Sequence, residues 1–417
     1  MGWIDVKPPI TFFSNLGEGV MTGLGPNGLQ LRWQNQPETE NIEISVEVSG
    51  YSYQGLYKDG ILKLENPPEG LMGSLRKAQH LHICEKKDVE SSDRYTGFSD
   101  YSLMPYALSG LSKDRLDMTQ MFLGRRFALP MLITGMTGGV QQGQDINERL
   151  ASAAAAFGIP MGVGSQRVAV EDPSLSAVFQ VKHRQPHIFL IGNMGLAQIL
   201  GKDALDKCKR AVDMIQADAL AIHLNVIQEL VQIEGDTSFV GVLEAIGQIC
   251  HHLDVPVVVK EVGCGLDLKS AQQLVSVGVQ ALDVGGRGGT SWGHIEGLRA
   301  QSQHVQRLGQ TFRDWGIPTA HGIKALSNHI TEPLIATGGL RDGFMIAKGV
   351  ALGADMCGIG LPLMKAAMKS EEAVHEELEF FKASLQIAMM ASGCEKLDHL
   401  KDRLIENVPN SYSDEGH

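Results

Sequence analysis

An apolar run of strand length, Ala219–Leu224, ends in a cluster of polar side chains. Alternate residues of a strand face the same side, so His223 and Asn225 are expected next to each other. The turn that follows is expected to bring Gln228 and Glu229 back toward the end of the strand. Polar groups at the carboxyl ends of buried parallel strands carry the chemistry of barrel enzymes. The segment is therefore a candidate catalytic site, with a strand running into a polar loop as the alternative.

Further runs of the same kind predict the element that positions these residues. The apolar runs are Leu129–Ile133, Ile159–Val163, Ile188–Gly192, Ala219–Leu224, Val255–Lys260, Ala281–Val284, Pro333–Ala336 and Ala354–Ile359. Segments of helical pattern lie between them, at Asp145–Phe157, Leu196–Asp213, Phe239–His252, Leu268–Val277 and Gly343–Leu352. Eight β-then-α units predict an α/β fold, a TIM (β/α)8 barrel. An open doubly wound sheet is the alternative.

The rest of the chain divides around this barrel. We expect an N-terminal extension of unknown role over 1–74, a substrate-clamping segment over 75–127, the barrel over 128–368, and C-terminal helices and tail over 369–417. Strands at Leu29–Trp33 and Ile42–Val48, with Asp59-Gly60 as a hairpin turn, predict a small β-rich extension; a partly disordered arm is the alternative. The stretch from Glu371 to Ile405 has a helical pattern.

Glycine-rich loops after the predicted strands suggest a phosphorylated ligand. Gly338-Gly339 allows close backbone approach, and the helix that follows is expected to offer its N–H groups to an anion. The loop Gly285–Trp292 adds Thr290 as a further donor. Before the barrel, Ser74 is a candidate helix cap. Arg76 and His80, four residues apart with Lys77 alongside, suit a diphosphate clamp, although a solvated basic patch is the simpler reading.

Two further charged residues are candidate ligand contacts. A buried Lys260 needs a partner. That partner is the electron-rich edge of a flavin, a local carboxylate such as Glu261 or Asp283, or a carbonyl carbon in a Schiff base. Glu229 is a candidate Mg²⁺ ligand, since one carboxylate together with substrate phosphates commonly holds this ion; a helix cap is the alternative.

Composition excludes several classes of protein. The chain has 417 residues and a net charge of −12, which argues against a nucleic-acid groove. Six scattered cysteines without a C-x-x-C pair suit reduced thiols in a cytosol. No apolar stretch has the length of a spanning helix, and the N-terminus lacks the form of a signal peptide. We therefore expect a cytoplasmic protein that does not act at a membrane.

Taken together, the motifs resemble those of the type 2, FMN-dependent isopentenyl diphosphate delta-isomerases. The match runs from about Leu75 to Leu400. The segments that carry it are Arg76-Lys77-x-x-His80, Met136–Gly139, Gly164–Arg167, Asn193, His223–Gln232, Glu234–Asp236, Lys260–Gly263, Gly288–Trp292, Asp314–Thr319 and Gly338–Arg341. The chain departs from the family at Gly285, where Ser or Ala is frequent, at Arg287, which replaces a small residue, and at Gly360, which is often Ala.

The resemblance implies a role for most of these residues. FMN would contact Met136, Thr137, Gly138, Ser165, Asn193, Lys260, Thr290, Gly338, Gly339, Leu340, Gly360 and Leu361. The prenyl diphosphate would contact Arg76, Lys77, His80, Ser165, Gln166, Arg167 and Gln228, with Mg²⁺ on Glu229. Gln228, His223 and Asn225 would be catalytic, Gln228 orienting the alkene or relaying a proton beside reduced FMN. NADPH would reduce the flavin, and the chain would form a tetramer or octamer.

Two other functions remain open at this stage. FMN-dependent 2-hydroxy-acid oxidases share the barrel and use a His-Gly-x-Arg arrangement late in it. Here His321-Gly322 is present, but no Arg follows at the matching place. A non-catalytic flavin-binding scaffold is the second alternative.

Overall fold

A computed structural model describes the backbone of residues 4–14, 17–25, 28–33, 42–48, 51–58, 61–64, 71–136, 141–233, 235–300 and 302–407. Within it, eight parallel strands close into a barrel in chain order. They are β10 (Met131–Ile133), β11 (Met161–Gly162), β12 (Leu190–Gly195), β13 (Ala219–Leu224), β14 (Val257–Glu261), β15 (Ala281–Asp283), β16 (Leu334–Thr337) and β17 (Met356–Ile359). The predicted TIM (β/α)8 barrel is confirmed, and the open sheet is excluded because β17 pairs with β10.

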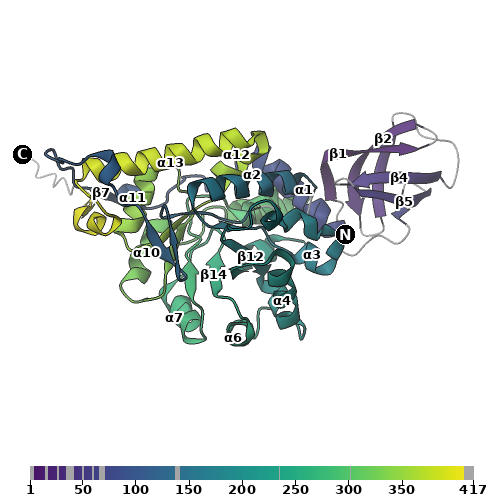
Figure 1. The fold of residues 1–417 in the computed structure, drawn as a ribbon. Helices are drawn as coiled ribbons and strands as arrows, with labels where there is room; N and C mark the ends of the chain where they lie inside the picture. The colour runs from purple at the N-terminus through teal and green to yellow at the C-terminus, as the bar shows by residue number, and fades with distance from the viewer. Residues whose placement is uncertain are drawn as a thin grey trace, which may run out of the picture.

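Helices follow the strands and surround the barrel (Figure 1). They are α2 (Gln141–Phe157), α3 (Arg167–Glu171), α4 (Ala204–Ile215), α5 (Val226–Val231), α6 (Val242–His252), α7 (Leu268–Ser276), α8 (Trp292–Arg299), α9 (Gln303–Thr311), α10 (Thr319–Ser327), α11 (Gly343–Ala351) and α12 (Leu361–Lys369). The helix predicted over Leu196–Asp213 is divided into a short 3-10 turn, Leu196–Ile199, and α4. Gly201 lies between the two parts, where its high conformational entropy disfavours a continuous helix.

The C-terminal stretch is helical over only part of the predicted length. Helix α13 (Glu371–Ala391) lies along α12 and α2 in Figure 1. It ends before Gly393, whose φ of 70° is the left-handed conformation that commonly terminates helices. A 3-10 turn and a strand, β18 (Leu404–Glu406), follow, and β18 pairs with β7 (Tyr101–Leu103). The prediction of helix up to Ile405 was therefore wrong.

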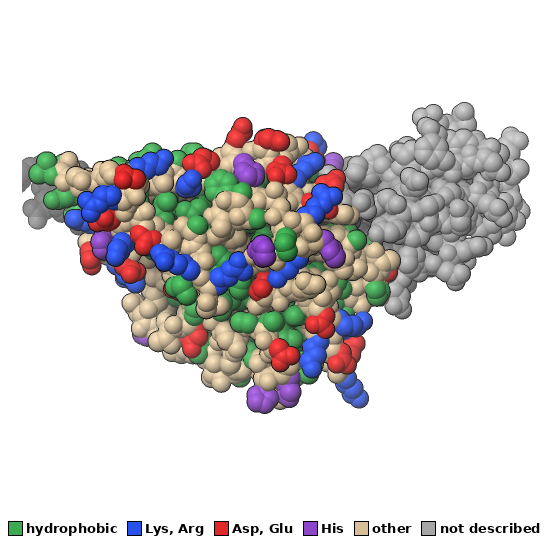
Figure 2. All heavy atoms as spheres, in the orientation of Figure 1, with side chains coloured by type: hydrophobic (Ala, Val, Ile, Leu, Met, Phe, Trp, Pro, Cys, Tyr) green, Lys and Arg blue, Asp and Glu red, His purple; other side chains and the backbone are tan. Residues whose placement is uncertain are grey.

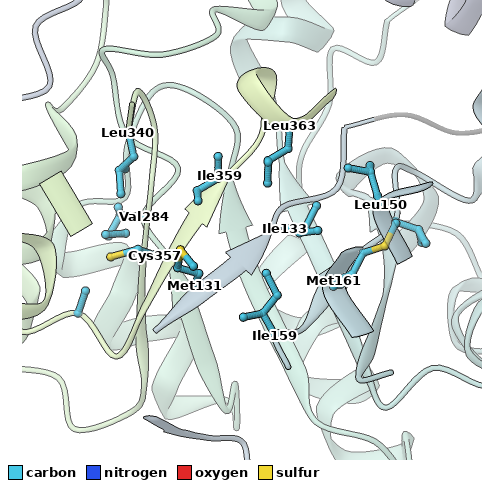
Figure 3. Packing of buried hydrophobic residues seen from close by; sticks show 14 of the residues in the cluster. Met131, Ile133, Leu150, Ile159, Met161, Val284, Leu340, Cys357, Ile359 and Leu363 are labelled. Carbon is cyan, nitrogen blue, oxygen red and sulfur yellow. The ribbon is translucent and has the colours of Figure 1, made fainter. Parts of the chain in front are cut away.

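The barrel is held by a core in which every residue of several strands is buried. Parallel strands covered on both faces are expected to be continuously apolar, and β10 and β17 are buried throughout. Figure 3 shows Ile133 of β10, Ile359 of β17 and Leu363 of α12 in one packed region. Leu340, which follows β16, points toward Val284 in the same view. The apolar side chain of Leu340 therefore anchors the loop after β16 in the core.

A hairpin outside the predicted barrel units closes one end of it. Strands β8 (Gln120–Phe122) and β9 (Arg125–Phe127) pair antiparallel. Phe122 and Phe127 form a buried cluster with Ala219, Ala281 and Met356, which are the first residues of their strands. The amino ends of the strands are therefore covered, and the carboxyl ends are left for ligands.

The N-terminal residues form a second, smaller barrel. Strands β1 (Ile4–Ser14), β2 (Gly17–Gly25), β3 (Gly28–Trp33), β4 (Ile42–Val48), β5 (Tyr51–Lys58) and β6 (Ile61–Leu64) are antiparallel and close in the order β1-β2-β3-β6-β5-β4. The predicted strands at Leu29–Trp33 and Ile42–Val48 are present. The candidate turn Asp59-Gly60, between β5 and β6, lies outside the described residues.

Helix α1 (Leu71–Lys86) connects this region to the large barrel. Ser74 lies within its first turn, so its prediction as the helix cap was wrong. Neither Gly73 nor Ser74 prevents a helical backbone, so the helix extends N-terminally past Ser74 to Leu71. All six cysteines are free. Among the described helices, none has the length and apolarity needed to cross a membrane.

Candidate active site

A cavity of about 1080 Å³, partly open to solvent, occupies the carboxyl ends of the barrel strands. It is lined by residues of α1, of the loops after the strands, and of α5. Most of the predicted site residues line it: Arg76, Lys77, His80, Met136, Ser165, Arg167, Asn193, His223, Asn225, Gln228, Glu229, Lys260, Thr290, Gly338, Gly339, Leu340, Gly360 and Leu361. Segments separated by almost 300 residues in the sequence thus converge on one cavity.

The register of the barrel places the central polar residues on one face of the sheet. Gly195 of β12 is paired with His223 of β13, and His223 with Lys260 of β14. Lys260 is in turn paired with Asp283 of β15. Residues that are paired across neighbouring parallel strands point to the same side of the sheet. His223 and Lys260 therefore form part of the cavity floor, and Gly195 leaves space beside the His223 ring.

His223 is held as a neutral imidazole. Its Nδ1 lies 2.8 Å from Oδ1 of Asn193, whose Nδ2 donates to the carbonyl of Val163. Because the Asn193 oxygen can only accept, we assign the proton to Nδ1 of His223. Burial lowers the pKa of His223 to about 3, helped by the charges of Lys260, Lys77 and Arg76. The ring can therefore accept a hydrogen bond at Nε2 but is not a proton donor of the imidazolium type.

Lys260 is a buried cation without a partner carboxylate. Its Nζ donates to the backbone carbonyl of Glu261 at 2.9 Å and forms no ion pair with Glu261 or Asp283 among the described residues. The Glu261 carboxylate instead accepts the backbone N–H groups of Val262, Gly263 and Cys264. Burial raises the pKa of Glu261 to about 7, although these hydrogen bonds and the charge of Lys260 act to lower it. This arrangement disfavours the local-carboxylate alternative and leaves Lys260 donors for a ligand.

Helix α5 presents an amide and a carboxylate in fixed orientations. Nδ2 of Asn225 donates to Oε1 of Gln228 at 3.2 Å and to Oε1 of Glu229 at 2.9 Å. Nε2 of Gln228 donates to Oε1 of Glu296 at 2.9 Å, so both ends of the Gln228 amide are engaged. The other oxygen of Glu229 accepts the N–H of Asp236 at 3.1 Å. These contacts hold Gln228 and Glu229 side by side at the cavity wall.

Glu296, on α8, was not recognised in the sequence as part of the site. It is 1% exposed, and its carboxylate also lies 2.9 Å from Nε2 of His80 and 2.8 Å from Nε of Arg299. Burial alone raises the pKa of Glu296, but His80, Arg299 and the Gln228 amide outweigh it, so the pKa lies well below its usual range. A signal was present in the sequence, since Glu296 follows Trp292, the last residue of a segment matched to the family, by one helical turn.

Helix α1 contributes cations to the cavity. Burial and the charges of Arg76 and Arg167 lower the pKa of Lys77 to about 7, against the opposing charges of Glu296 and Glu229. Lys77 is thus close enough to be influenced by four charged side chains, one from its own helix and one each from α3, α5 and α8. Clustered cations suit an anion with several negative charges, although Arg167 is also paired with Glu171 at 2.8 Å. Arg76, Lys77 and His80, which were predicted as a diphosphate clamp, all line the cavity.

Another part of the cavity wall is built from glycine loops. Gly338 and Gly339 have φ angles of 126° and 75°, and a Cβ at either would overlap neighbouring backbone. At the N-terminus of α11, Asp342 accepts from Met345 N and the Gly343 N–H donates to Ser384. These two N–H groups, which were expected to be offered to an anion, are therefore engaged within the protein.

Helix α12 offers the free N-terminus that α11 lacks. Gly360 at its cap position makes no side-chain cap bond, and Gly360 and Leu361 both line the cavity. An uncapped helix N-terminus attracts anions through its N–H groups and dipole. Leu340, by contrast, is 1% exposed and packs into the core, so its contact with a ligand would come through its backbone.

A strap of residues 88–100 holds the glycine loops from outside. The Thr96 side chain occupies the space where a Cβ on Gly288 or Gly339 would lie. Arg313 forms an ion pair with Asp88 at 2.9 Å, and Nζ of Lys348 donates to the Phe98 carbonyl at 3.0 Å. The strap thereby fixes the loops after β15 and β16 against each other.

One of the predicted contact residues that the structure describes, Gln166, is not brought into the cavity. Gln166 is fully buried behind its wall, where its amide bonds Ala211 O and Asn193 N, so its side chain is not available to a substrate. Thr137 and Gly138 lie outside the described residues.

The departures from the family pattern have local explanations. At Gly285, φ is 47° and a Cβ would lie 2.0 Å from the Glu261 carbonyl oxygen, so only glycine fits this backbone. Arg287 points away from the cavity, with its guanidinium 2.9 Å from Asp93 and stacked on Tyr95. At Gly360 a Cβ would meet only side-chain atoms of Met136 and Thr134, at 2.9 Å and 3.0 Å.

His321, the residue shared with the oxidases, is not among the residues that line the cavity. Its Nε2 lies 2.6 Å from Oδ2 of Asp100, and its side chain is 40% exposed. A base that removes a substrate proton must reach the bound substrate. The described geometry therefore disfavours the oxidase reading.

The residues that line the cavity fit FMN and a second anion. Five bases line it (Arg76, Lys77, Arg167, Lys260 and Arg341) against two acids (Glu229 and Glu261) among the described residues, in a chain of net charge −12. On the face drawn in Figure 2, acidic and basic side chains are interspersed. Asn225 Oδ1 and Gln232 Nε2 are buried at the cavity without a partner in the described part of the chain. Such groups are expected where a ligand completes the hydrogen bonding.

Comparisons with known proteins agree with this site. A family model of FMN-dependent dehydrogenases matches residues 223–407. An isopentenyl-diphosphate delta-isomerase from Nostoc sp. is 42% identical over 81% of this chain and 97% of the relative. One from Synechococcus sp. is 46% identical over 75% and 90%, and one from Pyrococcus furiosus is 41% identical over 80% and 86%.

Solved structures of lower sequence identity support the fold alone. A mandelate oxidase structure with 2-hydroxy-phenylacetamide has a TM-score of 0.54 at 19% identity and covers 80% of this chain and 93% of its own. A chimeric (S)-mandelate dehydrogenase has a TM-score of 0.56 at 18% identity and covers 79% and 99%.

Proposed function

The chain belongs to the isopentenyl-diphosphate delta-isomerase family, and we propose that it interconverts isopentenyl and dimethylallyl diphosphate by FMN-assisted allylic proton transfer. The observation that carries this proposal is a single cavity with two groups of candidate anion-binding residues. Glycine loops and the α12 N-terminus form one group, and the α1 cations form the other. His223, Lys260 and Gln228 line the same cavity.

FMN would occupy the part of the cavity formed by the glycine loops. Gly338, Gly339 and the N-terminus of α12 would hold its phosphate, with Thr290 as an added donor. Met136, Ser165, Asn193 and Leu361 complete the predicted contacts on the cavity wall. When bound and reduced, FMN supplies the acid–base chemistry of the reaction. Lys260 would stabilise negative charge on the bound flavin, because its ammonium group has no carboxylate partner among the residues that the structure describes.

The substrate diphosphate would bind beside the α1 cations. Arg76 and Arg167 offer guanidinium donors and Lys77 a point charge, beside Ser165 and His80. Glu229 would hold Mg²⁺ against the diphosphate, since a single carboxylate with phosphate oxygens and waters is a common magnesium site. No group of three potential metal-ligating side chains occurs among the described residues, so any ion here would need ligand oxygens.

Three residues would act on the hydrocarbon part of the substrate. Protonating an alkene requires an acid held close to it in a site that excludes water. Gln228 has its amide orientation set by Asn225 and Glu296, so it can orient the alkene or relay a proton without rotating. His223, held neutral, would position the ligand by accepting a hydrogen bond at Nε2. Asn225 would orient Gln228 and Glu229 together.

Further parts of the proposal rest on the family resemblance and on sequence. NADPH would reduce the flavin before turnover, and the chain would assemble with copies of itself, as a tetramer or octamer. A cytoplasmic location is supported by the six free thiols. Size-exclusion chromatography with light scattering tests the assembly, and a single protomer mass at micromolar concentration would contradict it.

The reaction is tested by incubating FMN-loaded protein with isopentenyl diphosphate, Mg²⁺ and NADPH without oxygen. We expect dimethylallyl diphosphate to form, and no oxygen uptake with mandelate or lactate when air is admitted. Gln228→Ala should lose most of this activity while FMN stays bound, whereas Gln273→Ala, an exposed residue of α7, should not. Full activity in Gln228→Ala would contradict the role assigned to Gln228.

A further inference from the structure

Gln232, directly after α5, is a buried amide without a hydrogen-bond acceptor for its donor group. The residue is 6% exposed and lines the cavity. No partner for its Nε2 is present in the described part of the chain. A buried N–H₂ group that has lost its water contacts and gained no acceptor is unfavourable. Its environment is therefore completed by something that enters the cavity.

The backbone fixes Gln232 beside the proposed magnesium ligand. Its N–H donates to the Gln228 carbonyl at 2.9 Å, which continues the pattern of α5 by one residue. Glu229 precedes it by three residues, so the two side chains share one face of the helix. The turn that follows, in which the Gly235 N–H donates to the Gln232 carbonyl at 3.1 Å, brings Asp236 N to the Glu229 carboxylate.

We propose that Gln232 donates its Nε2–H to an oxygen of the substrate diphosphate, next to the cation held by Glu229. This inference rests on the proposed function and adds a substrate contact to it. The chemistry of the position favours a neutral donor. A lysine or arginine here would pair with the Glu229 carboxylate and compete with the cation, whereas an amide binds a phosphate oxygen and leaves that carboxylate free. Gln232 thus selects for the diphosphate group without altering the charge of the site.

The test compares Gln232→Met with Gln232→Glu in FMN-loaded enzyme. Methionine keeps the length and volume of glutamine but has no donor. We expect the KM for isopentenyl diphosphate to rise roughly tenfold, with kcat within about twofold, because one hydrogen bond to a charged group is lost. Glutamate should raise KM further by repelling the diphosphate. The FMN dissociation constant should not change in either variant.

Gln180→Met is the matched control, because Gln180 donates to the Met214 carbonyl away from the cavity. It should lower Tm and leave KM unchanged. An unchanged KM in Gln232→Met would overturn the proposal and indicate that its amide binds only water. A fall in Tm and FMN affinity with unchanged KM would overturn it in favour of a structural role.

A second measurement separates this inference from the proposed function. Calorimetric titration with inorganic pyrophosphate and Mg²⁺ measures the diphosphate site without requiring turnover. If the wild-type protein binds pyrophosphate but does not isomerise isopentenyl diphosphate, the proposed function fails. The Gln232 contact is then judged by whether Gln232→Met weakens pyrophosphate binding by a factor similar to that expected for KM. Equal binding by both proteins would refute the contact.

Discussion

We expect substrate capture to depend on pH through the ionisation of Lys77. Burial, followed by the charges of Arg76 and Arg167, lowers its pKa to about 7 in the ligand-free chain. A diphosphate bound beside Lys77 favours the protonated amine, since an adjacent opposite charge stabilises the charged form. Above pH 7 the free enzyme must therefore take up a proton on Lys77 when it binds substrate. The value of kcat/KM reports the ionisation of free enzyme and free substrate.

The size of the effect follows from the pKa. The fraction of Lys77 that is protonated falls by roughly tenfold between pH 6 and pH 8 when the pKa is about 7. We expect kcat/KM for isopentenyl diphosphate to fall by about the same factor, and by roughly tenfold more at pH 9. Lys77→Arg replaces the amine by a group that stays charged over this range. Its profile should be flat above pH 7, because arginine needs no proton uptake.

The assay is the initial rate of dimethylallyl diphosphate formation at low substrate concentration, from pH 6 to pH 9, with pre-reduced FMN enzyme. The substrate phosphate titrates near pH 6 in both proteins, so its contribution cancels in the ratio of the two profiles. Calorimetry in buffers of different ionisation enthalpy should also show proton uptake at pH 8 for wild type only. Parallel profiles for wild type and Lys77→Arg would refute the reasoning.

Further predictions concern stability, the cofactor and the metal. Arg287→Ala should lower the free energy of unfolding by about 1–3 kcal/mol, because its hydrogen bonds to Asp93 and the Asp314 carbonyl are lost. The FMN dissociation constant should not change, and weaker FMN binding would place Arg287 at the flavin. His321→Ala should keep isomerase activity within about twofold, because His321 does not line the cavity, and loss of nearly all activity would restore the oxidase-like role. Leu340→Ala should cost about 2–5 kcal/mol of stability and weaken FMN binding, since the Leu340 side chain anchors the loop after β16 in the core. Unchanged FMN affinity would show that this loop does not need the Leu340 side chain to bind FMN. Glu229→Gln should raise the Mg²⁺ concentration needed for half-maximal rate, and an unchanged Mg²⁺ titration would argue against its role as ligand.

The sequence was sufficient for the barrel because burial leaves a strong local pattern. Strands covered on both faces must be apolar over their whole length, so runs such as Val257–Val259 are visible without any knowledge of their neighbours. The helix ends were harder to predict. The residues around Ser74 permit more than one start for α1, and those after Ala391 permit more than one end for α13. The left-handed backbone of Gly393 fixes the end of α13.

Site residues could be predicted where they follow a strand or where, as with Arg76 and Lys77, they form a local sequence motif. Glu296 was missed because its importance comes from contacts with Gln228 and His80, which are 68 and 216 residues away. The engagement of the α11 N-terminus was also not visible in the sequence, because Ser384, which accepts the Gly343 N–H, lies on α13. Such contacts depend on how the elements pack in space, and a single sequence does not contain that information.

The central claim is that reduced FMN and a prenyl diphosphate share one cavity, with the diphosphate held by the cations of α1. The most direct test is the absorption spectrum of the purified FMN protein, reduced without oxygen and titrated with isopentenyl diphosphate and Mg²⁺. We expect one FMN per chain and a saturable spectral change that is weakened in Arg76→Ala. A protein that does not retain FMN, or whose reduced spectrum is unaffected by the diphosphate, would contradict the account.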